Sequence, residues 1–327
     1  MSRDTLDRPE PAVGKRPGPA PRGRRRRASG TGARHARAAA GFLLPFLALF
    51  ALCFLAPIGY ALHQSLFTTE RTGPLGLGGH QREVFAGFAN YAHALSDDRF
   101  LTGFGRVLLF GAVQIPLMIA LATALALLLE SASARGVTFF RTAFFLPYGV
   151  PGVIASILWG FLYVPGISPL VKIAGTLGWD VDFLSRGTVL WSIANIVTWQ
   201  FTGYNMLVLI AQLKAVPGEL YEAARIDGAA AWQVARHIKL PLIRPALVLT
   251  CVFSIIGTLQ LFAEPMVLRP LASAIDSGFT PNLHAYSEAF VGNNQHVAAA
   301  EAVLLALVAC VLSFGFLRLV GGGTERR

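Results

Sequence analysis

The residues with the clearest chemical pattern lie in residues 214–245, which read KAVPGELYEAARIDGAAAWQVARHIKLPLIRP. Glu222 stands among alanines, which leave little side-chain bulk around its carboxylate. An arginine of a second protein could therefore approach closely and donate a charge-assisted hydrogen bond to Glu222. This chemistry serves recognition of a protein partner.

Local signals predict that the same segment folds into two short helices, and we call residues 214–245 the elbow. Pro217 is typical of the first turn of a helix, and that helix is expected to end near Gly228. Asp227 is predicted to cap the second helix, which Pro241 and Pro245 are predicted to end. The helix pattern alone slightly favours an elbow that lies on lipid headgroups.

A second set of polar residues interrupts two otherwise apolar runs. Gln200 and Tyr204 lie one helical turn apart, as do Gln260 and Glu264, so each pair shares a helix face. Amide, hydroxyl and aromatic groups at membrane depth suit hydrogen bonding and ring stacking with a polar solute, and such groups are costly there unless they face a partner or water. The candidates for a substrate path are Gln200, Tyr204, Asn205, Thr258, Gln260 and Glu264.

These polar residues also have a simpler interpretation, which is hydrogen bonding between helices of the same chain. We expect this role for about half of the polar residues in the two runs, with Asn195 and Ser254 as the strongest examples. Glu264 lies near the outer end of its run, where water could solvate it. Polar uncharged candidates outnumber basic ones, which favours a neutral solute over a phosphorylated one.

Several other chemistries lack their residues in this sequence. No glycine-rich loop followed by Gly-Lys-Ser or Gly-Lys-Thr is present to cradle nucleotide phosphates. The three cysteines, Cys53, Cys251 and Cys310, have no metal-ligand spacing. No carboxylate pair is expected at membrane depth, where a proton relay would need one. We therefore expect neither a metal nor a cofactor on this chain, and any ATP chemistry must sit on another chain.

The overall composition predicts a membrane protein. Of the 327 residues, 54% are hydrophobic and 14% are charged, too few charges to cover a soluble globule of this size. Six apolar runs can each supply the roughly 20 residues that cross a bilayer. We expect an all-α polytopic protein with spans at residues 40–62, 107–129, 143–164, 187–213, 246–268 and 297–320. Pro147 and Pro151 interrupt the third span and predict a kink or a break there.

The basic residues set the expected orientation. Residues 1–37 hold eleven Lys and Arg against three acidic residues, a net charge of +8, and predict a disordered cytoplasmic tail without a nucleic-acid partner. Twenty-one basic residues fall in predicted inner segments and seven in outer ones, as the positive-inside rule requires. Both termini are therefore expected in the cytoplasm, with a membrane domain at residues 38–320 that includes the cytoplasmic elbow, and a short tail at residues 321–327.

The spacing within the elbow resembles the signature loop, or EAA motif, of permease subunits of binding-protein-dependent ABC importers. The matching positions are Glu222, Ala223, Ala224, Gly228, Ile238, Leu240 and Pro241, with fixed gaps between them. Ile226, Asp227 and Gln233 are similar to the carbohydrate branch, specifically the maltose and glycerol-phosphate permease subunit that has a cytoplasmic amino-terminal tail. The resemblance covers about residues 40–320. Only about forty residues join the first two spans, so the large outer domain of the enterobacterial maltose subunit is missing.

This resemblance implies a type I ABC importer permease, in which the elbow is a coupling helix seated in a groove of a cytoplasmic ATPase. It assigns ATPase coupling to Glu222, Ala223, Ala224, Asp227 and Gly228. It also implies a second permease subunit, two ATPase subunits that bind ATP and Mg, and an extracytoplasmic sugar-binding protein. The location would be the cytoplasmic membrane of a bacterium or archaeon, and the chain would be a transporter subunit and not an enzyme.

The alternative is an ion-coupled secondary transporter or channel that works without an ATPase. Such a protein would need intramembrane carboxylates or basic groups for coupling, and the sequence places almost none there. The elbow motif and the scarcity of these groups both favour the ABC importer subunit.

Overall fold

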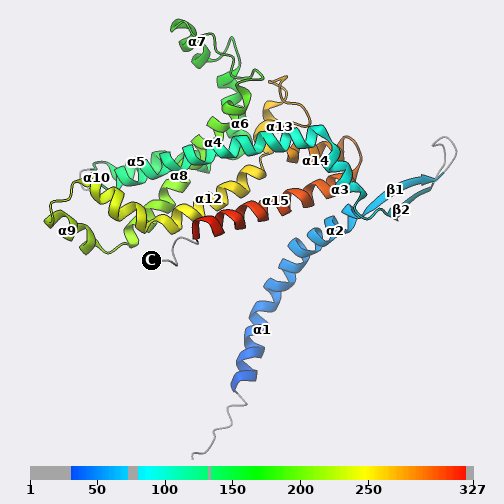
Figure 1. Cartoon of the computed structure of the whole chain (residues 1–327), viewed down its shortest axis with the longest axis horizontal. Helices are drawn as coiled ribbons and strands as arrows, with labels where there is room; N and C mark the ends of the chain where they lie inside the picture. The colour runs from blue at the N-terminus through cyan, green and yellow to red at the C-terminus, as the bar shows by residue number, and fades with distance from the viewer. Residues whose placement is uncertain (1–30, 73–79, 132–133, 322–327) are drawn as a thin grey trace, which may run out of the picture. The chain divides into compact units, whose positions relative to one another are not determined.

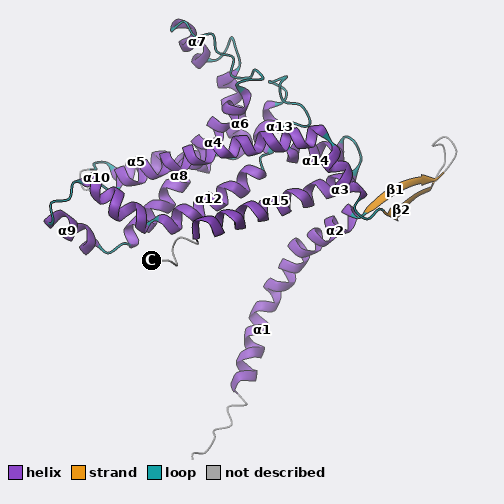
Figure 2. Cartoon of the chain, viewed as in Figure 1, coloured by secondary structure: helices purple, strands orange, loops and turns teal. Residues whose placement is uncertain are grey.

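The computed structural model describes residues 31–72, 80–131 and 134–321, which are mostly helical (Figures 1 and 2). The chain divides into two compact units, residues 1–57 and residues 58–327. In the first unit, α1 (Thr31–Phe50) runs into a π-helical turn, Ala51–Leu55. The first helix thus begins inside the segment expected as a tail, and the rest of that tail lies outside the described residues.

A β-hairpin occupies part of the connection between the first two predicted spans, where the sequence suggested only a loop. It follows α2 (Ala56–Ser65) and pairs β1 (Phe67–Thr72) with β2 (His80–Phe85) in antiparallel register. His296 holds the base of the hairpin: its Nδ1 lies 3.0 Å from the Gln64 carbonyl oxygen and its Nε2 lies 2.8 Å from Thr69 Oγ1. Since a carbonyl only accepts, Nδ1 donates there and Nε2 faces the Thr69 hydroxyl.

The second unit is a bundle built on α4 (Asp98–Leu129), α8 (Val189–Ala215), α12 (Arg244–Leu259) and α15 (Gln295–Gly321). α4 packs against both α8 and α12, and α15 packs against α12, α14 (Pro281–Phe290) and α3 (Ala89–Ser96). One buried cluster of apolar side chains includes Phe110, Ile193, Ile196, Leu268 and Leu283, and a second includes Ala122, Met206, Leu209 and Ile243. These clusters fix α8 between α4 and the later helices.

Four helices in the described parts of the chain are long and apolar enough to cross a membrane: Ala40–Ser65, Asp98–Leu129, Arg244–Leu268 and Gln295–Val320. A bent helix pair makes a fifth if it is counted as one span. α8 is not among them, although its 27 residues extend about 40 Å and cover the predicted fourth span. Six spans therefore stay a prediction, with five segments that coincide with predicted ones.

The third predicted span is broken in two, as its prolines suggested. α5 (Val137–Phe145) continues into a 3-10 turn (Leu146–Gly149), and α6 (Gly152–Tyr163) leaves at an angle of 97°. Val150 has extended backbone angles because it precedes Pro151, which disfavours helical geometry in the residue before it. The kink or break predicted within residues 143–164 is therefore present as a sharp bend between two half-helices.

The predicted fifth span also contains a break. α12 ends at Leu259, and α13 (Ala263–Leu268) begins after the three residues Gln260, Leu261 and Phe262. α13 packs against α6, so the half-helices that follow the two breaks lie together. α7 (Pro169–Thr176) follows α6 in the long connection to α8.

Candidate functional site

The first helix of the elbow ends as its glycine predicted. α9 (Gly218–Ile226) is followed by Gly228 with φ of +77°, a left-handed conformation that residues with a Cβ rarely adopt. The amide of Ala229 donates to the carbonyl of Ala224 at 2.9 Å. This is the hydrogen bond of a Schellman helix end, which requires a left-handed residue at Gly228.

The second helix of the elbow starts differently from the prediction. α10 (Ala231–Val234) has Ala230 at its N-cap, and the Ala230 amide donates to Gln233 Oε1 at 2.7 Å. The expected cap, Asp227, is used instead in the turn, where its amide donates to the Ala223 carbonyl at 3.0 Å. The helical path continues through a π turn (Ala235–Lys239) into α11 (Leu240–Leu242), so Pro241 does not end it.

Four of the five predicted coupling residues lie on the surface of the elbow. Glu222, Ala223, Asp227 and Gly228 are exposed, whereas Ala224 is buried. Glu222 is exposed, so a partner can reach its carboxylate. Ile226 and Trp232 are also strongly exposed, at 86% and 64%, which adds apolar surface beside the carboxylate.

The elbow is tied to the adjacent ends of α4 and α8. Lys239 Nζ donates to the Glu130 carbonyl, just beyond α4, at 3.0 Å, and the same ammonium lies 5.3 Å from the ring centroid of Tyr221. The Tyr221 hydroxyl donates to the Leu213 carbonyl of α8 at 3.3 Å, and burial raises the pKa of that phenol. Arg141 forms an ion pair with Glu130. A cavity of about 510 Å³ lies beside these contacts, between the elbow and the two helix ends.

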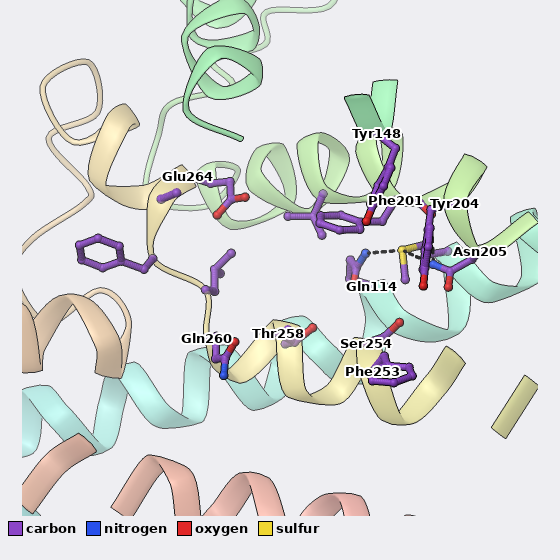
Figure 3. A pocket seen from close by; sticks show the side chains of 16 residues that line it. Gln114, Tyr148, Phe201, Tyr204, Asn205, Phe253, Ser254, Thr258, Gln260 and Glu264 are labelled. Atoms are coloured by element: carbon purple, nitrogen blue, oxygen red, sulfur yellow. Dashed lines mark hydrogen bonds between the residues drawn. The ribbon is translucent and has the colours of Figure 1, made fainter. Parts of the chain in front are cut away.

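A pocket of about 500 Å³ lies between α4, α8, α12 and the two helix breaks, and five of the six predicted path residues line it (Figure 3). They are Tyr204, Asn205, Thr258, Gln260 and Glu264. Tyr204 and Asn205 lie at one end of the pocket and Glu264 at the other, with Thr258 and Gln260 along one wall (Figure 3). None of the residues that line this pocket is basic.

Gln200, the sixth predicted path residue, does not line the pocket. Its side chain is buried, and its Nε2 donates to the Val150 carbonyl at 2.8 Å. That carbonyl lies at the break in the third predicted span, where no helical hydrogen bond can reach it. Gln200 therefore stabilises the break through a hydrogen bond within the chain, which is the alternative role that the sequence allowed for these polar residues.

The aromatic end of the pocket is built by the broken span and α8 together. The rings of Tyr148 and Tyr204 are stacked, with centroids 4.7 Å apart and planes 18° apart. Phe201 meets Tyr148 edge to face at 5.8 Å. Beside them, Asn205 is buried and donates to the Phe201 carbonyl at 3.1 Å. Stacked rings next to an amide form a surface that suits the apolar face and hydroxyl edge of a sugar ring.

The sequence interpretation missed several lining residues. Gln114 on α4 is buried, its Nε2 donates to Thr198 Oγ1 at 3.3 Å, and its Oε1 has no hydrogen-bond partner. Its signal was available, since it is the one amide in the uncharged run 107–129. Ser254, expected to be structural, lines the pocket. Asn195 does have the expected structural role, since its Nδ2 donates to the Tyr163 hydroxyl at 2.9 Å.

In the described parts of the chain, no group of three or more His, Cys, Asp or Glu side chains is arranged to hold a metal ion. The polar groups around the pocket are amides, hydroxyls and one carboxylate, which can bind a polar solute through hydrogen bonds but offer no paired acid and base for catalysis. The arrangement is therefore suited to binding and passage.

Comparison with known proteins assigns the family. A family model described as "Binding-protein-dependent transport system inner membrane component" matches residues 118–325. The diacetylchitobiose uptake system permease protein NgcF of Streptomyces coelicolor is 31% identical over 98% of this chain and 93% of its own length. The trehalose transport system permease protein SugA of Mycobacterium tuberculosis is 31% identical over 90% of this chain and 92% of its own length.

A solved structure supports the fold. A chain of a bacterial ABC transporter involved in the import of the acidic polysaccharide alginate superposes with a TM-score of 0.75 at 20% sequence identity, covering 89% of this chain and 97% of that one. The fold is therefore that of a type I ABC importer permease. Because the family model matches most of the chain and the relationship to NgcF extends over nearly all of it, this protein belongs to the binding-protein-dependent transport system inner membrane components, the multi-pass permease subunits of ATP-driven ABC importers.

Proposed function

We propose that this permease imports a neutral carbohydrate and that the pocket between α4, α8 and α12 is its half of the substrate path. The observation that carries the proposal is the stacked pair Tyr148 and Tyr204 beside the amides of Gln114 and Asn205. Aromatic faces and uncharged hydrogen-bonding groups match the two surfaces of a sugar ring. The relatives whose names mention diacetylchitobiose and trehalose support the same class of substrate.

The charge of the pocket supports a neutral substrate over a phosphorylated one. Glu264 is the single charged residue of the lining, and it is acidic. A phosphate group in this pocket would be repelled by Glu264 and would find no arginine or lysine to pair with. A neutral sugar instead gains an acceptor for its hydroxyl groups.

We further propose that the chain works with a second permease subunit, two ATPase subunits that bind ATP and Mg, and an extracytoplasmic sugar-binding protein. In this arrangement Glu222, Ala223, Ala224, Asp227 and Gly228 couple the elbow to one ATPase. The open carboxylate of Glu222 and the small exposed surface around it support that role. Both termini would then lie in the cytoplasm with the elbow, as the distribution of basic residues supports.

Reconstitution in proteoliposomes tests the proposed function. The complete complex, with binding protein outside and ATP inside, is expected to accumulate labelled neutral di- or oligosaccharides and not glycerol phosphate. The permease chain alone is expected to accumulate neither, with or without an ion gradient. Ion-driven uptake by the single chain, or uptake of glycerol phosphate in preference to every neutral sugar, would contradict the proposal.

The aromatic end of the pocket gives a sharper prediction. Tyr204→Leu removes an aromatic ring from the pocket lining, and a stacking contact of such a ring with the sugar would contribute about 1 kcal/mol. We expect the KM of uptake to rise roughly fivefold, with the same amount of assembled complex in the membrane. Uptake kinetics over a range of sugar concentrations measure the change.

The matched control for this variant is Phe139→Leu, which removes an exposed aromatic ring of α5 that does not line the pocket. We expect normal uptake kinetics from it. Equal effects of the two substitutions on KM would show that the pocket is not the sugar path.

A further inference from the structure

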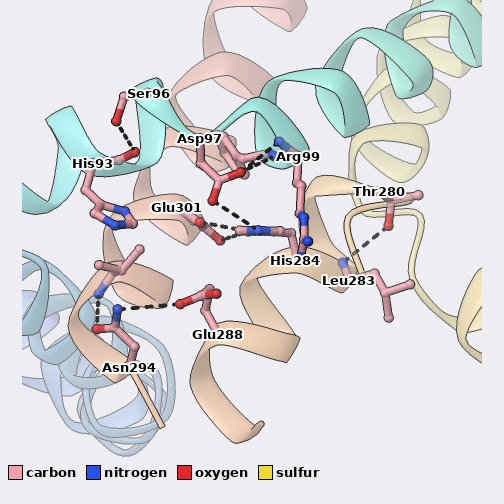
Figure 4. Close-up of polar contacts among 12 residues, drawn as sticks. His93, Ser96, Asp97, Arg99, Thr280, Leu283, His284, Glu288, Asn294 and Glu301 are labelled. Atoms are coloured by element: carbon pink, nitrogen blue, oxygen red, sulfur yellow. Dashed lines mark hydrogen bonds and ion pairs between the residues drawn. The ribbon is translucent and has the colours of Figure 1, made fainter. Parts of the chain in front are cut away.

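A buried charged cluster lies at the end of the bundle opposite the elbow, where the sequence suggested no titratable pair (Figures 1 and 4). It joins Asp97 at the start of α4, His284 of α14 and Glu301 of α15. Glu301 is completely buried, and His284 is 4% exposed. Sequence inspection missed the cluster because its members come from three elements.

The geometry shows which form of His284 fits the cluster. Its Nδ1 lies 2.9 and 3.1 Å from the two carboxylate oxygens of Glu301, and its Nε2 lies 3.6 Å from Asp97 Oδ2. Carboxylate oxygens are acceptors, so Nδ1 carries the proton that it donates to Glu301, while Nε2 faces Asp97 at an ion-pair distance. His284 therefore fits best as a cation between two anions from different elements. Asp97 is held in place by its Oδ1, which accepts from the amides of Arg99 and Phe100 at 2.7 and 3.3 Å.

α14 connects this cluster with the pocket. Asn282 and Tyr286 lie four residues apart and share one face of α14, whereas His284 points from the opposite side. Asn282 Nδ2 donates to the Leu259 carbonyl at 3.4 Å, and the rings of Tyr286 and Phe262 lie 5.3 Å apart. Leu259 is the last residue of α12, and Phe262 is the last residue of the break before α13. One face of α14 thus holds the charged cluster and the other holds both sides of the break.

We propose that Asp97, His284 and Glu301 form a positioning group that acts through α14 and holds the α12–α13 break in place. The break in turn fixes Gln260 and Glu264 in the pocket. Loss of the His284 proton releases this hold. The proposal deepens the proposed function, because it rests on the pocket being the sugar path. None of the three residues touches the pocket itself. Their role is to set where two of its lining residues stand.

The charges around His284 determine the direction of the pH dependence. The hydrogen bond to Glu301 raises the pKa of His284 above its ordinary value of 6.5; burial opposes this, and attraction from Glu301, Asp97 and Glu288 reinforces it. Two further groups face the cluster: His93 attracts Asp97, and the Arg99 side chain extends toward His284 in Figure 4. A raised pKa means that the hold is fully present below about pH 6.5 and is lost as the pH rises through the raised value. Alkaline conditions should therefore loosen the break.

Thiol labelling in the assembled complex tests this. Cys53, Cys251 and Cys310 are free, so they are first replaced by serine, and Gln260→Cys is added as a reporter in the break. Phe253→Cys, two turns earlier in the same pocket wall, corrects for the reactivity of thiols at different pH. The ratio of the two labelling rates with a membrane-impermeant maleimide is measured from about pH 6 to about pH 9. We expect the ratio to rise about tenfold, with a midpoint above pH 6.5.

Glu301→Gln separates positioning from simple packing. It keeps the shape and a hydrogen-bonding oxygen but removes the charge that favours the imidazolium, so the midpoint should fall by about one unit or more. Asp97→Asn still caps α4 and should shift the midpoint in the same direction. A packing defect would instead raise the ratio equally at every pH. A flat ratio in the parent protein, or a midpoint that neither variant moves, overturns the proposal.

The labelling experiment stands apart from the transport experiment. It reports the position of the break and needs no substrate, so it gives its result even if the complex imports no sugar. A pH-dependent ratio without sugar uptake would keep the positioning group and reject the proposed function. Sugar uptake together with a labelling ratio that does not change with pH would keep the proposed function and reject the positioning group.

Discussion

Replacing Gly203 with alanine is expected to prevent this permease from accumulating in the membrane. A Cβ at Gly203 would lie 1.8 Å from the carbonyl oxygen of Phe144 and 2.9 Å from the Cα of Phe145. Both are backbone atoms, which cannot move aside by a change of rotamer. Overpacking of a well-filled interior costs about 1 to 3 kcal/mol, and a clash with backbone exceeds the upper end of that range.

The measurement is the amount of protein in purified membranes and the melting temperature of the detergent-solubilised chain. Gly105→Ala is the matched control, because it also places a methyl group on a glycine inside a helix, but that Cβ meets nothing within 4 Å beyond its chain neighbours and the backbone of its own helix. We expect normal amounts and an unchanged or slightly higher melting temperature for Gly105→Ala. Normal accumulation of Gly203→Ala would mean that α5 and α8 do not approach as closely as described.

Substitutions in the elbow are expected to give the second large effect, which is loss of the ATPase from a permease that still inserts. Glu222→Ala removes the open carboxylate, whose hydrogen bond with a partner arginine is worth about 2 kcal/mol at a desolvated interface, roughly thirtyfold in affinity. Gly228→Trp places a bulky side chain at φ of +77°, where a Cβ is strained, and on the surface that would enter the groove. Co-purification of the ATPase and sugar uptake should fall together.

Two controls separate the causes. Glu219→Ala removes another exposed carboxylate of α9, outside the motif, and is expected to leave ATPase binding unchanged. Gly228→Asn tolerates the left-handed backbone but adds bulk, so a loss there points to the groove and not to strain. If Glu222→Ala and Gly228→Trp both keep full ATPase association and uptake, the elbow lies on lipid headgroups and the coupling role is wrong. The same experiment tests the cytoplasmic location of the elbow.

The local features of this protein were predictable from its sequence, because each depends on residues close together in the chain. The elbow sequence predicted the helix end at Gly228. The resemblance of the elbow to ABC importer permeases predicted a transporter subunit and not an enzyme, and family membership confirms that resemblance. Pro147 and Pro151 predicted a break in the third span. The bend of 97° could not be predicted from the sequence, because it depends on the packing of α6 against α13, which lies far away in the chain.

Features that depend on tertiary contacts were less accessible. Gln200 shares a helix face with Tyr204, yet it is turned toward the Val150 carbonyl because the neighbouring proline leaves that carbonyl without a helical partner. Glu301 and Arg318 are the two charges in the apolar run at residues 296–320. The partner of Glu301, His284, lies on another helix, and no spacing rule predicts their pairing. The polar residues in the apolar runs therefore indicated five pocket residues, whereas the cluster of Asp97, His284 and Glu301 was missed.

The contact between Lys239 and the end of α4 has a mechanical consequence. Lys239 binds the carbonyl of Glu130, and Gln114 lies sixteen residues earlier on the same continuous helix, about 24 Å away along its axis. α4 runs without a break between these two residues, although Pro116 lies between them, so a tilt of the elbow can be passed along the helix to the wall that carries Gln114. The cavity of about 510 Å³ beside the Lys239 contact supplies clearance for that tilt. In the proposed complex, closure of the ATPase subunits on ATP would then change the width of the pocket between α4, α8 and α12.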